Sequence, residues 1–150
     1  MSPEALERFR RQVSELEGAA RVPRMRDCVQ HGRVSTWAHC VRVAKVAVGM
    51  AEALHLCVSE RELVRAALLH DYFLYDWHEP GHTAHATMHP VFALEKARED
   101  FNLSPLEENA IAAHMWPLPP TRIPASAEAW LICAADKWCS LAETLWDALG

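Results

Sequence analysis

Apolar residues recur at intervals of three and four along most of this 150-residue chain. This spacing places side chains on one face of an α-helix. Serines that can cap a helix stand before several of the periodic segments. Together these signals predict helices over 3–17, 23–32, 35–56, 59–71, 88–100, 104–114 and from 126 nearly to the C-terminus. Because strand signals are weak, the pattern predicts an all-α, single-domain bundle of about six to seven helices.

Two of the predicted helix starts carry a capping box. The segments Ser59 to Glu62 and Ser104 to Glu107 each place a serine three residues before a glutamate, which lets the two side chains satisfy backbone N–H groups at the start of a helix. Two longer segments, 76–87 and 115–125, separate the helices. The first is polar and rich in histidine, and loops of about a dozen residues in a compact domain are often functional.

Polar donors interrupt the apolar faces of the predicted helices. They are His39, His70, His114 and Asp136, with Asp71 directly after His70 and His89 near the start of a further helix. A buried carboxylate costs several kcal/mol unless it is paired or bound to a metal. A single inward histidine is usually a core residue held by a hydrogen bond, but inward donors on four separate helices indicate a metal cluster inside a helical bundle.

Composition narrows the choice of partners. The apolar fraction of 51% is that of a globular protein, and the formal net charge of −5 argues against a nucleic-acid polymer or an anionic membrane as partner. No apolar stretch reaches the roughly 20 residues of a membrane span, and the N-terminus lacks the apolar segment of a signal peptide. Five cysteines without a C-x-x-C spacing argue against disulfides or a thiolate zinc site. We therefore expect a cytoplasmic protein.

Three segments resemble the motifs of the HD superfamily, which is named for its His-Asp pair. Ser35 to Ala44 resembles the first motif, Ala67 to Asp71 the hallmark motif, and Ala134 to Lys137 the closing motif. The resemblance implies an HD-type bundle with its motif-bearing core over about 35–145, on which the N-terminal helices of 3–32 pack. It also implies one metal site formed by His39, His70, Asp71 and Asp136.

Two further histidines extend the resemblance to members that hold two metals. The segments around His89 and His114 are similar to those that supply the second metal, with Asp71 bridging the pair. Taken alone, His89 also fits an exposed residue at a helix start. The set implies two divalent transition-metal ions of iron, manganese, nickel, cobalt or zinc, because nitrogen-rich ligands suit these ions better than magnesium or calcium.

Differences from the family's motifs reduce the number of activities that this sequence can be expected to have. Leu74 stands where members that cleave cyclic dinucleotides often carry a lysine, His114 is followed by Met115, and the Gly-Tyr-Pro signature is missing. A cyclic-dinucleotide phosphodiesterase is therefore disfavoured. The six donors also resemble those of the di-iron HD oxygenases, such as myo-inositol oxygenase and the phosphonate-cleaving enzyme.

Other residues near the motifs are candidates for contact with substrate. Lys137 follows a predicted ligand directly and Arg42 lies near His39, so either can reach a phosphate, although both also fit a solvated helix face. His82 and His85 lie in the histidine-rich segment, where they can bind substrate or give a proton to a leaving group. Incidental histidines in a polar loop are the other interpretation.

These observations predict a metal-dependent phosphohydrolase, a phosphomonoesterase or phosphodiesterase that acts through a metal-bridging hydroxide. Its substrate would be a small phosphorylated molecule or nucleotide. Asp71, Lys137 and His85 are the predicted catalytic residues, and Arg42, Lys137 and His82 the predicted substrate contacts. The alternatives are a di-iron HD oxygenase and a non-catalytic module that binds a nucleotide or metal for regulation.

Overall fold

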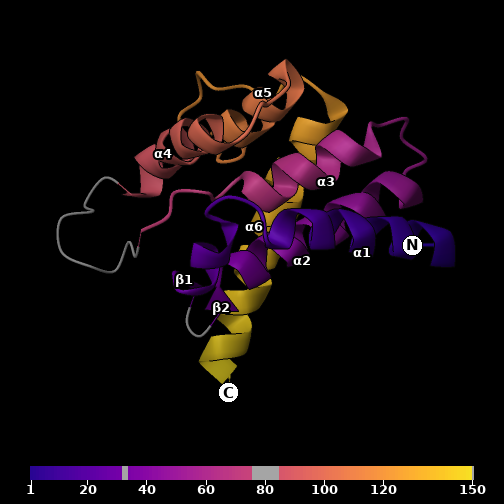
Figure 1. Cartoon of the computed structure of the whole chain (residues 1–150), viewed down its shortest axis with the longest axis horizontal. Coiled ribbons are helices and arrows are strands. Elements are labelled where there is room, and N and C mark those ends of the chain that lie inside the picture. Colours follow the sequence, from indigo (N-terminus) through magenta and orange to yellow (C-terminus); the bar gives the residue numbers. More distant parts are fainter. Residues whose placement is uncertain (32–33, 76–84, 150) are drawn as a thin grey trace.

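The computed structural model describes residues 1–31, 34–75 and 85–149. In these residues the protein is all-α apart from one short hairpin (Figure 1). The α-helices are α1 (Pro3–Glu17), α2 (Thr36–Ala53), α3 (Glu60–Leu69), α4 (His85–Asp100), α5 (Pro105–Ala113) and α6 (Ala127–Leu149). A 3-10 helix, η1 (Val22–Arg26), and two strands, β1 (Val29–His31) and β2 (Val34–Ser35), lie between α1 and α2. The predicted all-α bundle is confirmed.

Serine caps fix the starts of four helices. The hydroxyls of Ser2, Ser35 and Ser126 each accept a hydrogen bond from the backbone N–H three residues later. At α5 the capping box is complete: Ser104 Oγ accepts from the Glu107 N–H at 3.2 Å, and a Glu107 carboxylate oxygen accepts from the Ser104 N–H at 2.8 Å. These bonds satisfy N–H groups that have no partner inside the helix.

The predicted capping box at Ser59 is wrong. The Ser59 hydroxyl accepts no bond from the first turn of α3, and the Ser59 N–H instead donates to Glu128 on α6 at 2.8 Å. A long-range carboxylate therefore replaces the local cap. The sequence pattern could not distinguish the two cases, because both serines precede a glutamate by three residues.

Other boundaries also differ from the prediction. α3 ends at Leu69, so His70 and Asp71 follow the helix instead of lying within it. The expected helix over 23–32 is wrong, because the chain forms only the 3-10 helix η1 and then β1, which pairs antiparallel with β2. Strands of two and three residues are too short to show an alternating pattern. α2 ends at Ala53, and His55 follows with a φ of 51° that no helix continues. α4 begins at His85, before the predicted residue 88.

The hydrophobic core lies where α2, α3 and α6 meet. α2 packs against both α3 and α6, while α5 packs against α3, α4 and α6. Residues such as Val43, Leu63 and Ile132 bring fully buried side chains into this core from α2, α3 and α6. α1 lies along α3, and α6 passes behind the other helices with its C-terminal half extending beyond them (Figure 1). Within the described part of the chain, no helix is both long and apolar enough to span a membrane.

The different roles of Ser104 and Ser59 at the starts of α5 and α3 give a stability prediction. Ser104→Ala removes a hydroxyl that caps α5, so the free energy of unfolding should fall by about 1 kcal/mol. Ser59→Ala is the matched control, because this serine is also half-buried and stands at the same place relative to its helix, yet does not cap it. Urea denaturation followed by circular dichroism compares the two. Equal losses in both variants would contradict the assignment of the caps.

Candidate metal centre

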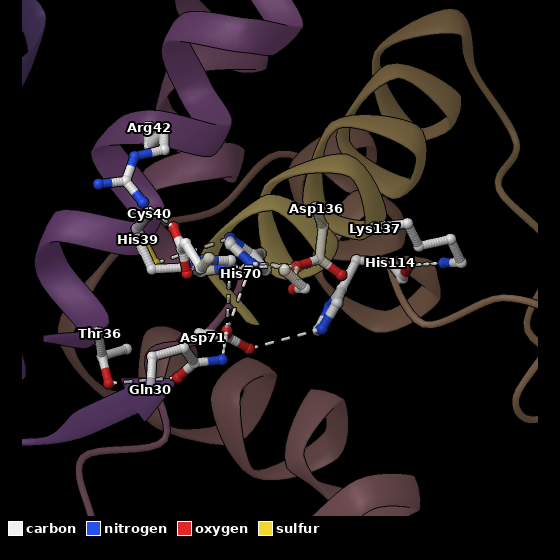
Figure 2. Close-up of polar contacts among 12 residues, drawn as sticks. Gln30, Thr36, His39, Cys40, Arg42, His70, Asp71, His114, Asp136 and Lys137 are labelled. Carbon is white, nitrogen blue, oxygen red and sulfur yellow. Dashed lines mark hydrogen bonds and ion pairs between the residues drawn. The ribbon is translucent and has the colours of Figure 1, made fainter. Parts of the chain in front are cut away.

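Five helices bring the six predicted donors to one buried cluster. His39 lies at the end of the first turn of α2, His89 in the second turn of α4 and Asp136 in the middle of α6. His70 and His114 stand at the C-caps of α3 and α5, and Asp71 follows His70 directly. All six are buried, with at most 6% of their surface exposed. Figure 2 shows five of them pointing toward one another.

Helix ends orient two of the histidines in the same way. The Nδ1 atoms of His70 and His114 each lie 2.7 Å from the backbone carbonyl three residues earlier, those of Ala67 and Ile111. A carbonyl can only accept, so Nδ1 carries the proton and Nε2 keeps its lone pair. Both lone pairs therefore face the cluster. This is the arrangement in which metal-binding histidines are held by an outer partner.

A carboxylate takes the corresponding place at His39. Its Nδ1 lies 2.9 Å from a carboxylate oxygen of Glu143, and its Nε2 lies 3.1 Å from Asp136 Oδ1. Arg42 forms an ion pair with the same Glu143, whose carboxylate is 2% exposed. A charged outer partner raises the basicity of the imidazole, so His39 is prepared to bind a cation strongly.

The donors form two groups that share Asp71 as a neighbour. In the first, His39, His70 and Asp136 lie close enough to hold one ion. In the second, Asp71, His89 and His114 do so: Asp71 Oδ1 lies 3.4 Å from His89 Nε2 and 3.5 Å from His114 Nε2. The other oxygen of Asp71, Oδ2, faces the first group, at 3.3 Å from His70 Nε2.

The pKa values show that the cluster attracts positive charge. Burial by itself lowers the pKa of His39, but hydrogen bonds with Asp136 and Glu143 outweigh it and raise the pKa to about 10. Burial raises the pKa of Asp71, but the charge that His70 carries when it is protonated outweighs this, and the pKa falls well below its usual range. Burial and the charge of His70 lower the pKa of His114 to about 3, so this imidazole is neutral.

Two buried atoms test whether a metal suits this cluster. Among the described residues, His70 Nε2 and Asp71 Oδ1 make no hydrogen bond, and neither is exposed to solvent. When His70 is neutral, with its proton on Nδ1, both atoms carry lone pairs and neither can donate to the other. An unsatisfied buried polar atom costs about 1–3 kcal/mol. A cation satisfies both at once. Imidazole and carboxylate donors together suit a divalent transition metal, so the residues fit such an ion.

The sequence of this chain matches the HD domain family over residues 36–140. The chain belongs to the HD family. No curated protein and no solved structure was found to match it. Most members of this family are metal-dependent hydrolases, which agrees with the donors collected in the cluster.

Two residues that hold this HD site escaped the sequence reasoning. Glu143 lies seven residues after Asp136, on the same face of α6, so the helical period contained a signal for it. Gln30 donates its Nε2 hydrogen to Asp71 Oδ2 at 2.6 Å. No local pattern singled out Gln30, because it lies on a strand that the sequence did not predict. Both lie outside the range that matches the HD family.

Arg42 and Lys137, the predicted phosphate contacts, both have protein partners in this HD domain. Arg42 pairs with Glu143 on one side of the cluster. The Lys137 ammonium donates to the carbonyl of His114 at 3.1 Å and lies 3.2 Å from Cys133 Sγ, on the other side (Figure 2). Either side chain has to leave these partners to reach a substrate. Their roles as substrate contacts stay predictions.

The two predicted loop histidines are not placed at the site. His82 lies outside the described residues. His85 is the first residue of α4, but its side chain is also outside the description. A third group of possible ligands adds Cys40 to His70 and Asp71. Cys40 Sγ approaches His70 from the Nδ1 side, at 3.7 Å, and that nitrogen already donates to Ala67.

A groove of about 820 Å³ between α1 and α3 lies apart from the HD cluster. Arginines such as Arg11 and Arg61 line it, together with Phe101 from the segment after α4. None of the six donors lines this groove. The chemistry that the cluster supports is therefore separate from the groove.

The central position of Asp71 gives a direct prediction. Asp71→Asn keeps the shape of the side chain but removes its charge, so the affinity for divalent metal should fall by at least about tenfold. Elemental analysis of protein purified without chelator measures the effect. Asp100→Asn is the control, because it removes a carboxylate that pairs with Arg21 and Tyr72 away from the cluster. An Asp71→Asn protein with the metal content of the wild type would refute a ligand role for Asp71.

Proposed function

We propose that this HD domain is a metal-dependent phosphohydrolase that holds two divalent transition metals and acts on a small phosphate ester or nucleotide. The position of Asp71 carries the proposal. One of its oxygens faces His89 and His114, and the other faces His70. A carboxylate with a different set of imidazoles at each oxygen is suited to bridge two ions, which two-metal hydrolases hold about 3.5–4 Å apart.

The first ion would be held by His39, His70 and Asp136, and the second by His89 and His114, with Asp71 shared. When bound, such ions supply Lewis acidity toward phosphoryl oxygens and lower the pKa of water. The chain's contribution is to fix the donors before the metals arrive. The Ala67 and Ile111 carbonyls and the Glu143 carboxylate hold three imidazoles by Nδ1, so that each turns its Nε2 toward the cluster.

The other candidate residues around the cluster can contact a phosphorylated substrate. Arg42 and Lys137 flank the cluster on opposite sides and are proposed to approach a bound phosphate by exchanging their present partners. His82 and His85 are proposed as substrate contact and proton donor, respectively. Hydrolysis requires no serine or cysteine nucleophile when metals activate water, so the buried free cysteines need no catalytic role.

The same donors support a second candidate, a di-iron oxygenase. The observation in its favour is the nitrogen-rich cluster itself, since four imidazoles and two carboxylates are donors that iron accepts. Hydrolysis ranks first because it is the commoner activity in the family to which the chain belongs. A regulatory module that binds metal or nucleotide without reaction is the third candidate.

The number of metals is the first test. If His89 and His114 hold the second ion, His89→Ala or His114→Ala should lower the metal content from about two ions per chain to about one, because the first ion keeps its own ligands. Elemental analysis after reloading with Mn²⁺ measures this. His55→Ala is the control, since His55 is exposed after α2. An unchanged content in both variants would leave His89 and His114 as packing or substrate residues and return the chain to the four-ligand HD class.

The choice between the chemistries is the second test. Hydrolysis needs no change of oxidation state, so the protein should release phosphate from a panel of phosphomonoesters and nucleotides without oxygen, loaded with Mn²⁺, Co²⁺ or Zn²⁺. Asp71→Asn should lower this rate by about 10²-fold or more, since the site loses its shared ligand.

Two results would replace the hydrolase proposal. If the panel stays silent with every metal while the iron-loaded protein consumes oxygen with a polyol or phosphonate, the oxygenase takes its place. If neither reaction occurs but nucleotides raise the melting temperature of the wild-type protein, the regulatory module replaces the hydrolase as the proposed function.

A further inference from the structure

A short hairpin outside the matched HD range reaches into the metal cluster. Gln30 lies on β1, and 6% of the residue's surface is exposed. Its Nε2 donates to Asp71 Oδ2 at 2.6 Å. This is the oxygen on the side of His70, whereas Asp71 Oδ1 points toward His114 (Figure 2). The hairpin therefore contacts one oxygen of the shared carboxylate and leaves the other toward the second group of donors.

Thr36 contacts the oxygen end of the Gln30 amide. The Thr36 hydroxyl, at the start of α2, is 3.3 Å from Gln30 Oε1 and 3.2 Å from the Cys28 carbonyl. The Thr36 N–H also donates to the Cys28 carbonyl at 2.8 Å, so the residue is tied to the strand. With Oε1 turned toward Thr36, the NH₂ group of Gln30 faces the carboxylate. The reversed amide would place two acceptors against each other.

We propose that Gln30 is a positioning residue that keeps Asp71 in the bridging orientation. A carboxylate at a pair of metals can bridge them with one oxygen each, or turn about its Cβ–Cγ bond and give both oxygens to one ion. The bond from Gln30 occupies one lone pair of Oδ2 and resists this rotation. It therefore keeps Oδ1 available for the ion at His89 and His114, and makes the second metal bind more tightly. This inference rests on the proposed two-metal site.

The two groups of donors depend on this bond to different degrees. The first has Asp136 as a carboxylate of its own, and His39 is supported by Glu143. In the second, Asp71 Oδ1 is the one carboxylate oxygen grouped with His89 and His114 among the described residues. Loss of the Gln30 bond should therefore affect the second metal far more than the first.

The test is a titration of the metal-free full-length protein with Mn²⁺, followed by calorimetry and electron paramagnetic resonance. Gln30→Met keeps the volume of the side chain but removes the donor. We expect the first binding event to stay within about twofold of wild type and the second to weaken about 10- to 100-fold, the range for loss of an outer partner of a ligand. The resonance spectrum should change from that of a coupled Mn²⁺ pair to that of an isolated ion.

Two further variants separate positioning from general damage to the fold. Thr36→Val keeps Gln30 but releases its amide, so it should weaken the second event in the same direction by a smaller factor. Gln12→Met is the matched control, because Gln12 bonds Glu60 between α1 and α3 and should leave both events unchanged. If the Gln30→Met variant does not fold, the Thr36→Val titration tests the proposal instead: an unchanged second binding event would then overturn it.

The possible failures can be told apart. A wild-type protein that binds a single Mn²⁺ overturns the two-metal site and this inference with it. A wild type that binds two, with a Gln30→Met variant that binds both equally well, overturns the role of Gln30 alone. Equal weakening of both events also overturns it, because Gln30 would then support the cluster as a whole.

Discussion

The ionised carboxylate of Asp71, held 1% exposed among imidazoles, is the constraint on which the centre depends. Removing such a charge from water costs several kcal/mol, and the structure offsets this with charge and hydrogen bonds from every side. His70 lies beside it, His89 and His114 face one oxygen, and Gln30 donates to the other. Each of these partners comes from a different element, so α3, α4, α5 and the hairpin must all be in place before the charge is stabilised.

The C-terminal ends of α3 and α5 orient the imidazole rings of His70 and His114. At the C-caps of α3 and α5, a histidine ring reaches back to the carbonyl three residues earlier. One of the carbonyls that a helix end leaves without a partner is thereby satisfied. The same bond sets the tautomer, so local helix structure and metal chemistry are served by one contact. His39 lies inside a helix and has no such carbonyl, and Glu143 takes that role.

The family match covers the six donors, whereas two of their supports lie beyond its ends. Gln30 precedes residue 36 and Glu143 follows residue 140. Both act on the cluster through side chains that are themselves buried. The six donors lie within the range that matches the family, while side chains from the segments around that range contact them. We infer that properties such as metal affinity depend on these flanking segments as well as on the shared motifs.

The sequence by itself determined the six α-helices in the described part of the chain and several of the polar residues that turn inward. Periodicity placed His39, His70, His114 and Asp136 on apolar faces, because the helical repeat is local and each stripe needs only a few neighbours to be recognised. The complete cap at Ser104 followed from the same local chemistry. Only the tertiary structure decided that Ser59 binds Glu128 and that Gln30 reaches Asp71. These contacts join residues 69 and 41 positions apart, and no local pattern encodes a partner that folding alone brings near.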